Sequence, residues 1–314
     1  MAFEPRAWRR RTKAEPTAPA DGRARRGSST RPGAADLETY WKGLHAQRGT
    51  VSDLEIVCHP GAPAWLNRYV ADTQRRVFLR MLGETGNLAG ASVLDVGCGT
   101  GRWSQQLRDH GAKVLAIDIS PEAIEANRQQ IPGVEFRVAD LAHLDMPESG
   151  FDLIVSVTVL QHLSFEEQRS ASAALARALR PGGQMLVLEN IRDRGPHVFS
   201  RPIAGWADLF RQSGLSAGNV VGYSFDLPLR LASVPVSAWG VLSRWRGRSD
   251  PQPPVASGGS GESSGRSGPL ELYWRFVYRP LGWVSRLVEP ASERLLPAAM
   301  ATHAALLFRR STAP

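Results

Sequence analysis

Three glycines at alternate positions are the first feature of this sequence that could do chemistry. Gly97, Gly99 and Gly101 directly follow the apolar run Val93–Val96. Glycine lets the backbone approach a ligand closely, and it adopts backbone angles that other residues avoid. In open parallel sheets, a loop of this kind between a strand and a helix receives nucleotide-like ligands. The spacing therefore predicts a strand, a tight loop and a binding site for such a ligand.

Acidic side chains end the next two predicted strands. Asp118 closes the second strand about 20 residues after the glycine loop, where an acid can accept hydrogen bonds from both hydroxyl groups of a ribose. Asp140 follows the third strand. Because such ligands bind at the carboxyl ends of the strands, we expect both carboxylates to face a common crevice beside the glycines.

A dinucleotide is the main rival ligand at this loop. Its G-x-G-x-x-G pattern requires a third glycine at position 102, where this chain has Arg102. A pyrophosphate also needs uncluttered backbone donors, whereas Arg102 and the bulky Trp103 open the following helix. The residues therefore disfavour a dinucleotide.

Strands and helices alternate along the middle of the chain. Apolar strands are predicted at residues 93–96, 113–119, 134–138, 151–157, 184–189, 219–223 and 304–308. Helices are predicted at 36–47, 62–82, 103–110, from 120 onward, 164–179 and 204–213. The alternation predicts an α/β fold with a doubly wound, mostly parallel seven-stranded sheet and helices on both faces. An N-terminal helical cap and a helical insertion before the last strand complete the expected architecture.

The stretch from Ala91 to Asn190, with a weaker match at 304–308, resembles class I (Rossmann-like) S-adenosylmethionine-dependent methyltransferases. The shared features are Asp95 followed by three alternate glycines, the acids after strands two and three, and the segment Leu179–Gly183 before strand five. The resemblance implies S-adenosylmethionine as the cofactor and methyl transfer as the activity. Since the sulfonium carbon is already electrophilic, the protein would mainly align the acceptor and exclude water.

The resemblance also implies a role for each residue around the cofactor. Asp95 would orient the loop and the methionine amino group, while the three glycines give the methionine and ribose room. Asp118 would hold the ribose, and Asp140 would accept a hydrogen bond from the adenine amino group. The remaining cofactor-binding residues would pack on the adenine, fit within the loop or line the methionine side: Cys98, Ile119, Leu141, Val157 and Thr158.

His162, just after the fourth strand, is the candidate catalytic residue. Many relatives carry a histidine there, and it would act as a general base or position the acceptor. The alternative is a histidine that packs beneath the acceptor pocket. Glu189, Asn190 and His197 are expected to line the pocket rather than act as bases. No metal site is expected, because the other histidines form no recognisable ligand set with nearby carboxylates.

The formal net charge of +8 is concentrated at the start of the chain. Residues 1–35 contain nine Lys and Arg against three acids and have little apolar content, which predicts a disordered basic tail. The two cysteines, Cys58 and Cys98, have no disulfide or metal-ligand spacing, and no apolar run is long enough to span a membrane. A cytoplasmic protein is therefore expected, with contact at a membrane surface left open.

The rest of the chain divides into three parts. We expect an N-terminal helical cap, a cofactor-binding domain in two pieces, and a helical insertion or lid that contains a flexible linker. The corresponding residues are 36–90 for the cap, 91–224 and 301–310 for the domain, 225–300 for the insertion and 249–269 for the linker.

The expected acceptor is a small molecule or a glycan- or lipid-linked intermediate, methylated on oxygen or nitrogen. Segments 229–246 and 270–296 carry Trp and Arg, so they would either contact a membrane surface or simply pack on the sheet. Nucleic acid is disfavoured, because Thr158–Gln161 replaces the tetrapeptide with two prolines that amino-methylating DNA enzymes use. A non-catalytic relative that binds the cofactor and acts as a scaffold is the alternative from another class.

Overall fold

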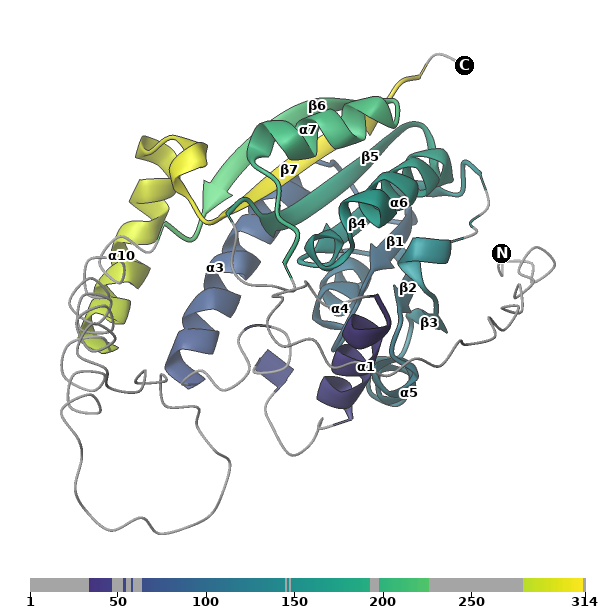
Figure 1. Cartoon of the computed structure of the whole chain (residues 1–314), viewed down its shortest axis with the longest axis horizontal. Coiled ribbons are helices and arrows are strands. Elements are labelled where there is room, and N and C mark those ends of the chain that lie inside the picture. Colours follow the sequence, from purple (N-terminus) through teal and green to yellow (C-terminus); the bar gives the residue numbers. More distant parts are fainter. Residues whose placement is uncertain are drawn as a thin grey trace, which may run out of the picture.

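The computed structural model describes residues 34–46, 53–54, 58, 64–144, 146, 148–192, 198–225 and 279–312 (Figure 1). Several predictions fall outside these residues. They concern the basic tail up to residue 33, the linker 249–269, the segment 229–246 and the pocket candidate His197. The division of the chain into cap, domain and insertion stays a prediction.

Seven strands in the described residues form one sheet in the order β3-β2-β1-β4-β5-β7-β6. Their bounds are β1 Ser92–Val96, β2 Lys113–Asp118, β3 Glu135–Val138, β4 Phe151–Val157, β5 Leu179–Asn190, β6 Leu215–Tyr223 and β7 His303–Arg310. The first five strands pair in parallel, and β7 runs antiparallel to both β5 and β6. The predicted doubly wound, mostly parallel fold is confirmed.

Helices cover both faces of the sheet (Figure 1). One face packs against α3 Ala64–Gly83, α4 Arg102–Asp109 and α5 Pro121–Gln130, and the other against α6 Phe165–Ala178 and α7 Ile203–Gln212. The remaining helices are α1 Ala34–His45 and α10 Arg279–Leu295, with short 3₁₀ turns at η2 Leu141–His143, η3 Leu160–His162 and η5 Ala298–Met300. The helix α10 lies beside α3 at one end of the molecule.

Burial on both faces explains the apolar sequence of the central strands. In β1, Leu94 and Val96 contribute to one hydrophobic cluster, whereas Val93 faces the other. In β4, Ile154 belongs to the first cluster and Val155 to the second. Side chains alternate across a strand, so a strand with helices on both sides needs apolar residues at consecutive positions.

The start of β5 differs from the sequence prediction. It begins at Leu179 and includes the Pro181–Gly183 segment that was predicted as a turn before the strand. The pairing with β4 is irregular there, with Phe151 opposite Leu179 and then Leu153 opposite Gln184. Gly182 has a φ of 77°. The proline and glycines therefore form a bulge inside the strand rather than a loop outside it.

The strand order locates the ligand-binding crevice. After β1 the chain continues to β2 on one side, whereas β4 lies on the other side of β1. The loops that leave β1 and β4 therefore diverge, and a crevice opens between them at the carboxyl ends of the strands. The glycine loop follows β1, and the turn η3 with His162 follows β4.

Candidate cofactor and acceptor site

A cavity of about 240 Å³ lies at this crevice. Every predicted cofactor and catalytic residue lines it except Asp95 and Gly101. The predicted residues in its wall are Gly97, Cys98, Gly99, Asp118, Ile119, Asp140, Leu141, Val157, Thr158 and His162. They come from four separate loops, so the fold brings them together from a stretch of more than sixty residues.

The glycine loop has a conformation that only glycine adopts readily. Gly97, Gly99 and Gly101 have φ values of 64°, 53° and 78°. A Cβ atom on Gly97 would overlap the side chain of Val159, and one on Gly101 would overlap that of Ile131. The loop therefore packs closely against the segment after β4 and presents its backbone to the cavity.

Hydrogen bonds from two sides hold the loop. The Gly99 amide donates to Asp118 Oδ2 at 2.8 Å, and the Ser120 amide donates to Asp118 Oδ1 at 2.9 Å. Asn127 Nδ2 donates to the Gly99 carbonyl at 2.8 Å. The Asp118 side chain, only 8% exposed, thus joins the end of β2 to the loop while remaining in the cavity wall.

Asp95 lies beneath the loop rather than in the cavity wall. Its carboxylate is buried and accepts a hydrogen bond of 2.5 Å from the Ser104 hydroxyl of α4. Burial raises the pKa of Asp95 to about 7, although the Ser104 bond opposes this shift. Asp95 therefore connects β1 to the first turn of α4, which fixes where the intervening loop lies.

Asp140 lies at the mouth of the cavity. Its Oδ1 accepts a hydrogen bond from the Ala142 amide at 2.9 Å, which caps the turn η2. Its Oδ2 lies 2.7 Å from His143 Nδ1, and both side chains are partly exposed. One carboxylate oxygen therefore shapes the turn, and the other faces a histidine at the entrance.

The segment after β4 is held by a buried acid on β5. Glu189 is fully buried, and its carboxylate accepts hydrogen bonds from the amides of Val159, Leu160 and Gln161 at 3.1, 2.9 and 3.3 Å. Burial raises the pKa of Glu189 to about 8. Thr158, at the start of the segment, has a φ of 57°, an uncommon conformation for a β-branched residue.

The prediction that Glu189 and Asn190 line the pocket is wrong. Neither belongs to the cavity wall. Glu189 points under the segment that carries His162, and the Asn190 side chain donates to Gln161 Oε1 at 2.8 Å. Both residues support the wall from behind because three backbone N–H groups and a buried amide require partners there.

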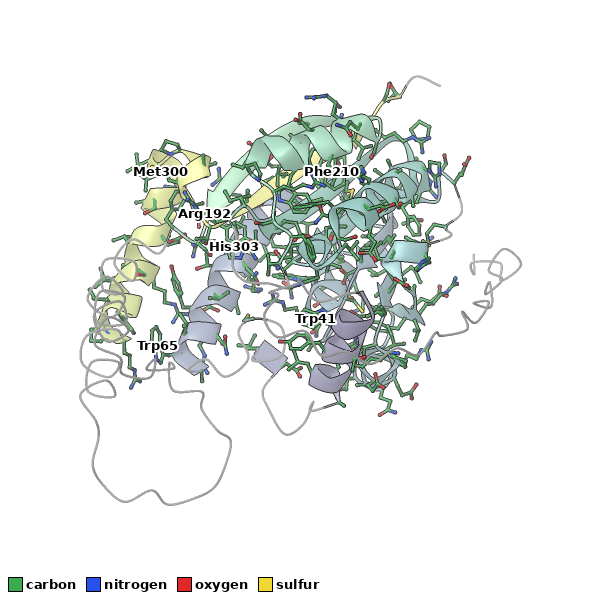
Figure 2. All side chains as sticks on the ribbon, in the orientation of Figure 1. Trp41, Trp65, Arg192, Phe210, Met300 and His303 are labelled. Atoms are coloured by element: carbon green, nitrogen blue, oxygen red, sulfur yellow. The ribbon has the colours of Figure 1, made fainter. Side chains whose placement is uncertain are left out.

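Helix α1, which packs against α5, forms part of the cavity wall. Trp41, labelled in Figure 2, and His45 both line the cavity. The Trp41 ring meets the His162 ring edge-on, with centroids 4.9 Å apart. His162 Nε2 lies 3.2 Å from Gln161 Nε2. The candidate catalytic histidine is thus placed between an aromatic cover and the end of β4.

The comparisons with known proteins agree with this geometry. The family profile described as a methyltransferase domain matches residues 93–183, which run from β1 through the start of β5. A trans-aconitate 2-methyltransferase of Methylobacterium nodulans is 32% identical over 176 residues, covering 54% of this chain and 67% of the relative. The chain belongs to the class I S-adenosylmethionine-dependent methyltransferases.

Other members of the methyltransferase family are similar over more of the chain. A 2-methyl-6-phytyl-1,4-hydroquinone methyltransferase of Synechocystis is 26% identical over 277 residues, which is 79% of this chain and 71% of the relative. The crystal structure of a putative sarcosine dimethylglycine methyltransferase from Galdieria sulphuraria has a TM-score of 0.53 and 17% identity, covering 88% of this chain and 99% of that one. The match to several curated relatives spans only about half of their length.

The pocket fits the cofactor of the family, S-adenosylmethionine. Gly97 and Gly99 line the cavity without side chains, so the loop offers a cradle of bare backbone there. Asp118 presents a carboxylate beside that cradle, and Ile117, Ile119 and Leu141 provide apolar surface. These are the groups that a ribose and a purine ring require. Among the described residues, no group of three His, Cys, Asp or Glu side chains could hold a metal ion.

Twelve lining residues were not predicted from the sequence as site residues, and six of them have aromatic or charged or ionisable side chains: Trp41, His45, Arg102, Trp103, His143 and Glu167. Arg102 bonds the side chain of Gln74 on α3, and its guanidinium lies 4.2 Å from the centre of the Trp103 ring. Burial lowers the pKa of Arg102. The sequence signal that could have identified Arg102 as a site residue was its position directly after the third glycine. The first helical residue after such a loop points back toward the ligand.

Proposed function

We propose that this protein transfers the methyl group of S-adenosylmethionine to a small-molecule acceptor bound beneath α1. The observation that carries the proposal is the composition of a single cavity. Its wall contains the glycine loop and Asp118 together with Trp41, His45 and His162. A methyltransferase needs a cofactor pocket that opens directly onto an acceptor pocket, so that the reacting atoms meet without water.

The residues of the wall divide between the parts of the cofactor. Asp118 accepts hydrogen bonds from the ribose hydroxyls, and Ile119 and Leu141 pack against the adenine. Asp140 accepts from the adenine amino group. The backbone of Gly97 and Gly99, together with Val157 and Thr158, accommodates the methionine. All these residues line the same cavity, which supports the assignment.

Arg102 is an additional candidate for holding the cofactor. Its side chain lines the cavity between the glycine loop and α3. The methionine part of the cofactor ends in a carboxylate, and a guanidinium binds a carboxylate through paired hydrogen bonds. Arg102 therefore neutralises the carboxylate end of the cofactor, while Asp118 binds the other end.

Oxygen is the acceptor atom that the site favours. The bound cofactor supplies an electrophilic methyl group, but a hydroxyl acceptor must also lose its proton. His162 lies at the end of β4 in the cavity wall, and a neutral imidazole accepts a proton near neutral pH. The Trp41 ring, packed edge-on against the His162 ring, limits the orientations of the imidazole.

A lipid-linked acceptor is the finer proposal for the substrate class. A relative that is similar over 79% of this chain is named for a phytyl-bearing hydroquinone. A hydroquinone offers a planar ring that fits against Trp41. Such an acceptor would require the protein to work at a membrane surface, whereas a free or glycan-linked acceptor would not.

Methyl transfer is tested by incubating the chain with S-adenosylmethionine and a panel of hydroquinones, phenols and carboxylic acids. We expect release of S-adenosylhomocysteine with a hydroxylated aromatic acceptor. His162→Gln should lower kcat about 100-fold or more without weakening cofactor binding. The matched control is His110→Gln, which changes an exposed histidine outside the cavity and should leave kcat unchanged.

Two results would overturn the proposal. Tight cofactor binding without turnover of any acceptor would instead support a scaffold that only binds S-adenosylmethionine. A His162→Gln variant with unchanged kcat would remove the histidine from the mechanism and leave it as packing against Trp41.

A further inference from the structure

The helix α10 has its polar side buried and its apolar side exposed. Gly282, Ser285, Glu289 and Ser292 are buried on the side that faces the rest of the protein. Trp283, Leu287 and Leu295 are 68%, 69% and 80% exposed. A helix that only packs on a core shows the opposite arrangement. The prediction that this segment simply packs on the sheet therefore does not explain its sequence.

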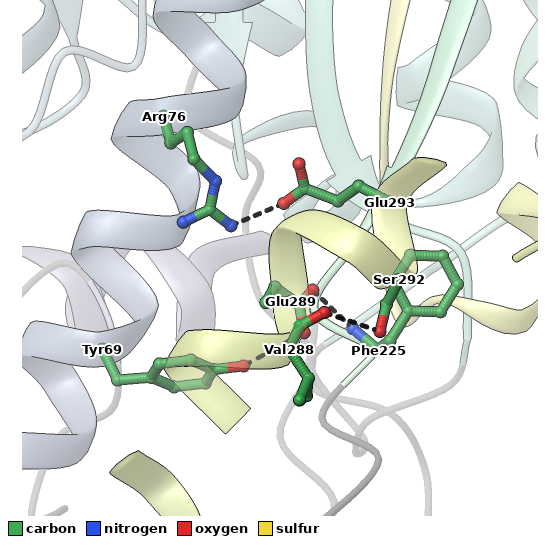
Figure 3. A network of polar contacts seen from close by, with 7 residues as sticks. All are labelled: Tyr69, Arg76, Phe225, Val288, Glu289, Ser292 and Glu293. Atoms are coloured by element: carbon green, nitrogen blue, oxygen red, sulfur yellow. Dashed lines mark hydrogen bonds and ion pairs between the residues drawn. The ribbon is translucent and has the colours of Figure 1, made fainter. Parts of the chain in front are cut away.

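Polar contacts fix which side of α10 faces inward (Figure 3). The Tyr69 hydroxyl of α3 donates to Glu289 Oε2 at 3.2 Å, and the Phe225 amide donates to Glu289 Oε1 at 2.8 Å. Arg76 of α3 pairs with Glu293 at 2.6 Å. Figure 2 shows Trp65 at the same contact, where a Cβ on Gly282 would overlap its ring. Rotation of α10 would break all these contacts.

The exposed apolar side chains form one continuous stripe. Trp283, Val284, Leu287, Val288 and Leu295 are all exposed. Spacings of one, four and seven or eight residues place them on the same side of a helix. The helix has 17 residues and is thus about 25 Å long. We call these five residues the α10 stripe.

The charges on the exposed side of α10 all have one sign. Arg279, Arg286 and Arg294 are exposed, and their spacing places them together along one edge of the stripe. Arg286 also pairs with Asp72 of α3. The two acids of the helix, Glu289 and Glu293, point inward toward Phe225 and α3. The outward surface of α10 therefore combines apolar side chains with arginines alone.

We infer that the α10 stripe docks on the surface of an anionic lipid bilayer. An interfacial helix buries an apolar face in the boundary between headgroups and acyl chains and places cations beside the phosphates. Trp283 suits that boundary, because its ring is apolar and its N–H is polar. No helix in the described part of the chain is long and apolar enough to cross a membrane, so the contact is on the surface.

Charge also distinguishes a bilayer from a second copy of the chain. In a two-fold symmetric dimer the same face meets itself. The arginine edges of two stripes would then approach each other, and α10 exposes no acid to pair with them. Asp72 of α3 pairs with Arg286, and anionic lipid headgroups provide opposite charge for Arg279 and Arg294.

The inference rests on the proposed lipid-linked acceptor and names the surface through which the protein would reach the membrane that carries it. It is tested with the full chain and without an acceptor, so its failure and a failure of methyl transfer are separate results. The experiment is co-sedimentation with vesicles of phosphatidylcholine, with and without 30% phosphatidylglycerol. We expect binding to the mixed vesicles and at least 10-fold weaker binding to the neutral ones. Each arginine that contacts anionic lipid should strengthen binding about fivefold.

Two double variants separate the apolar and the cationic contributions. Trp283→Ser with Leu287→Ser should weaken binding to the mixed vesicles at least 10-fold. Arg279→Gln with Arg294→Gln should reduce the preference for anionic lipid about 10-fold or more. The charge-matched control is Arg128→Gln with Arg211→Gln on α5 and α7, which should bind as the wild type does. The basic residues 1–35 are present in every variant, so their contribution cancels.

Thermal melting of each variant checks that the fold is retained, since all the substituted side chains on α10 are exposed. The inference is overturned if the Trp283→Ser, Leu287→Ser variant binds mixed vesicles as tightly as the wild type. It is also overturned if the wild type forms a dimer in sedimentation equilibrium that this variant loses, because the stripe would then be an interface between two copies.

Discussion

At the scale of single residues, the glycine loop sets the most stringent requirement in the site. Gly97 combines a positive φ with direct contact to Val159, which begins the segment that carries His162. The loop that holds the cofactor and the segment that holds the candidate base therefore touch at one glycine. A side chain at this position would disturb both halves of the site.

The first prediction concerns this contact. Gly97→Ala should destabilise the fold by about 2–4 kcal/mol, because a strained φ and an overlap with Val159 act together. It should also weaken S-adenosylmethionine binding at least 10-fold. Gly214→Ala is the matched control, because Gly214 has a φ of 86° but open space around it. It should cost only about 1 kcal/mol and leave cofactor binding unchanged. Urea unfolding and cofactor titration measure both effects.

Equal behaviour of the two alanine variants would show that backbone conformation alone, and not contact with Val159, makes glycine necessary at position 97. Such a result would remove the proposed coupling between the loop and the segment after β4.

Individual site residues could be predicted where the pattern that identifies them lies within a few neighbouring residues of the sequence. The glycines and the acids at the ends of β2 and β3 follow directly from strand-to-loop patterns, and all of them except Gly101 line the cavity. Glu189 was predicted to line the pocket, whereas its side chain lies behind the cavity wall and binds the backbone of the segment after β4. Side chains alternate across a strand, so whether an acid at a strand end faces a cavity or a neighbouring loop depends on the exact register. Periodicity does not reveal that register.

At the scale of elements, the contact between α3 and α10 is the least expected feature of the fold. Two helices more than 200 residues apart in sequence are joined through Tyr69, Arg76, Glu289 and Glu293. Gly282 lets α10 approach the ring of Trp65. This contact orients α10 and therefore decides which of its side chains reach solvent.

The second prediction tests that close approach. Gly282→Ala should lower the stability by about 1–3 kcal/mol, because the new methyl group overlaps the Trp65 ring. Gly83→Ala, at the end of α3 where nothing lies within 4 Å, should be neutral or slightly stabilising. Differential scanning calorimetry of both variants gives the comparison. A Gly282→Ala protein that melts with the wild type would contradict the packing of α10 on α3.

Most elements could be predicted because their patterns are local. The strands around the crevice are short apolar runs, and the capping box of Ser164 and Glu167 begins α6 as expected. The order of strands and the antiparallel direction of β7 could not be derived in the same way, because pairing joins residues far apart in the chain. The same reason explains why Trp41 and His45 were not predicted as site residues. Their role depends on where α1 docks.

At the scale of the whole molecule, two buried acids give the fold an unusual dependence on pH. Burial raises the pKa of Asp95 to about 7 and that of Glu189 to about 8. A carboxyl group with a raised pKa binds more protons in the folded state than in the unfolded chain. Its contribution to stability is complete below about pH 4 and is lost as the pH rises through 7 and 8.

The third prediction follows from this sign. In Glu189→Gln, the free energy of unfolding should fall less steeply between pH 5 and 8 than in the wild type, because one titrating group is absent. Each such carboxyl changes the unfolding constant by up to about tenfold per pH unit. Glu125→Gln, an exposed control on α5, should leave the slope unchanged. Urea unfolding at several pH values provides the data, and identical slopes for wild type and Glu189→Gln would contradict the raised pKa.

The overall architecture follows from the sequence for a physical reason. Alternating strands and helices have few ways to bury both faces of a parallel sheet, and the doubly wound fold is one of them. For residues 225–300, the sequence predicted only a helical insertion or lid, without saying which side of its helices would be exposed. Of that region, the structure describes Phe225 and residues 279–300, and the exposed side of α10 becomes evident only once its contact with α3 is known.

The central claim is that one cavity, bounded by the glycine loop and Asp118, binds S-adenosylmethionine. Isothermal titration of the cofactor into the full chain tests it most directly. We expect saturable binding to one site, weakened about 10- to 100-fold in Asp118→Asn, because hydrogen bonds to a charged group are lost. Asp109→Asn, an exposed acid at the end of α4, should bind as the wild type does. A folded chain that releases no saturable heat with the cofactor or its demethylated product, or an Asp118→Asn variant with unchanged affinity, would contradict the account.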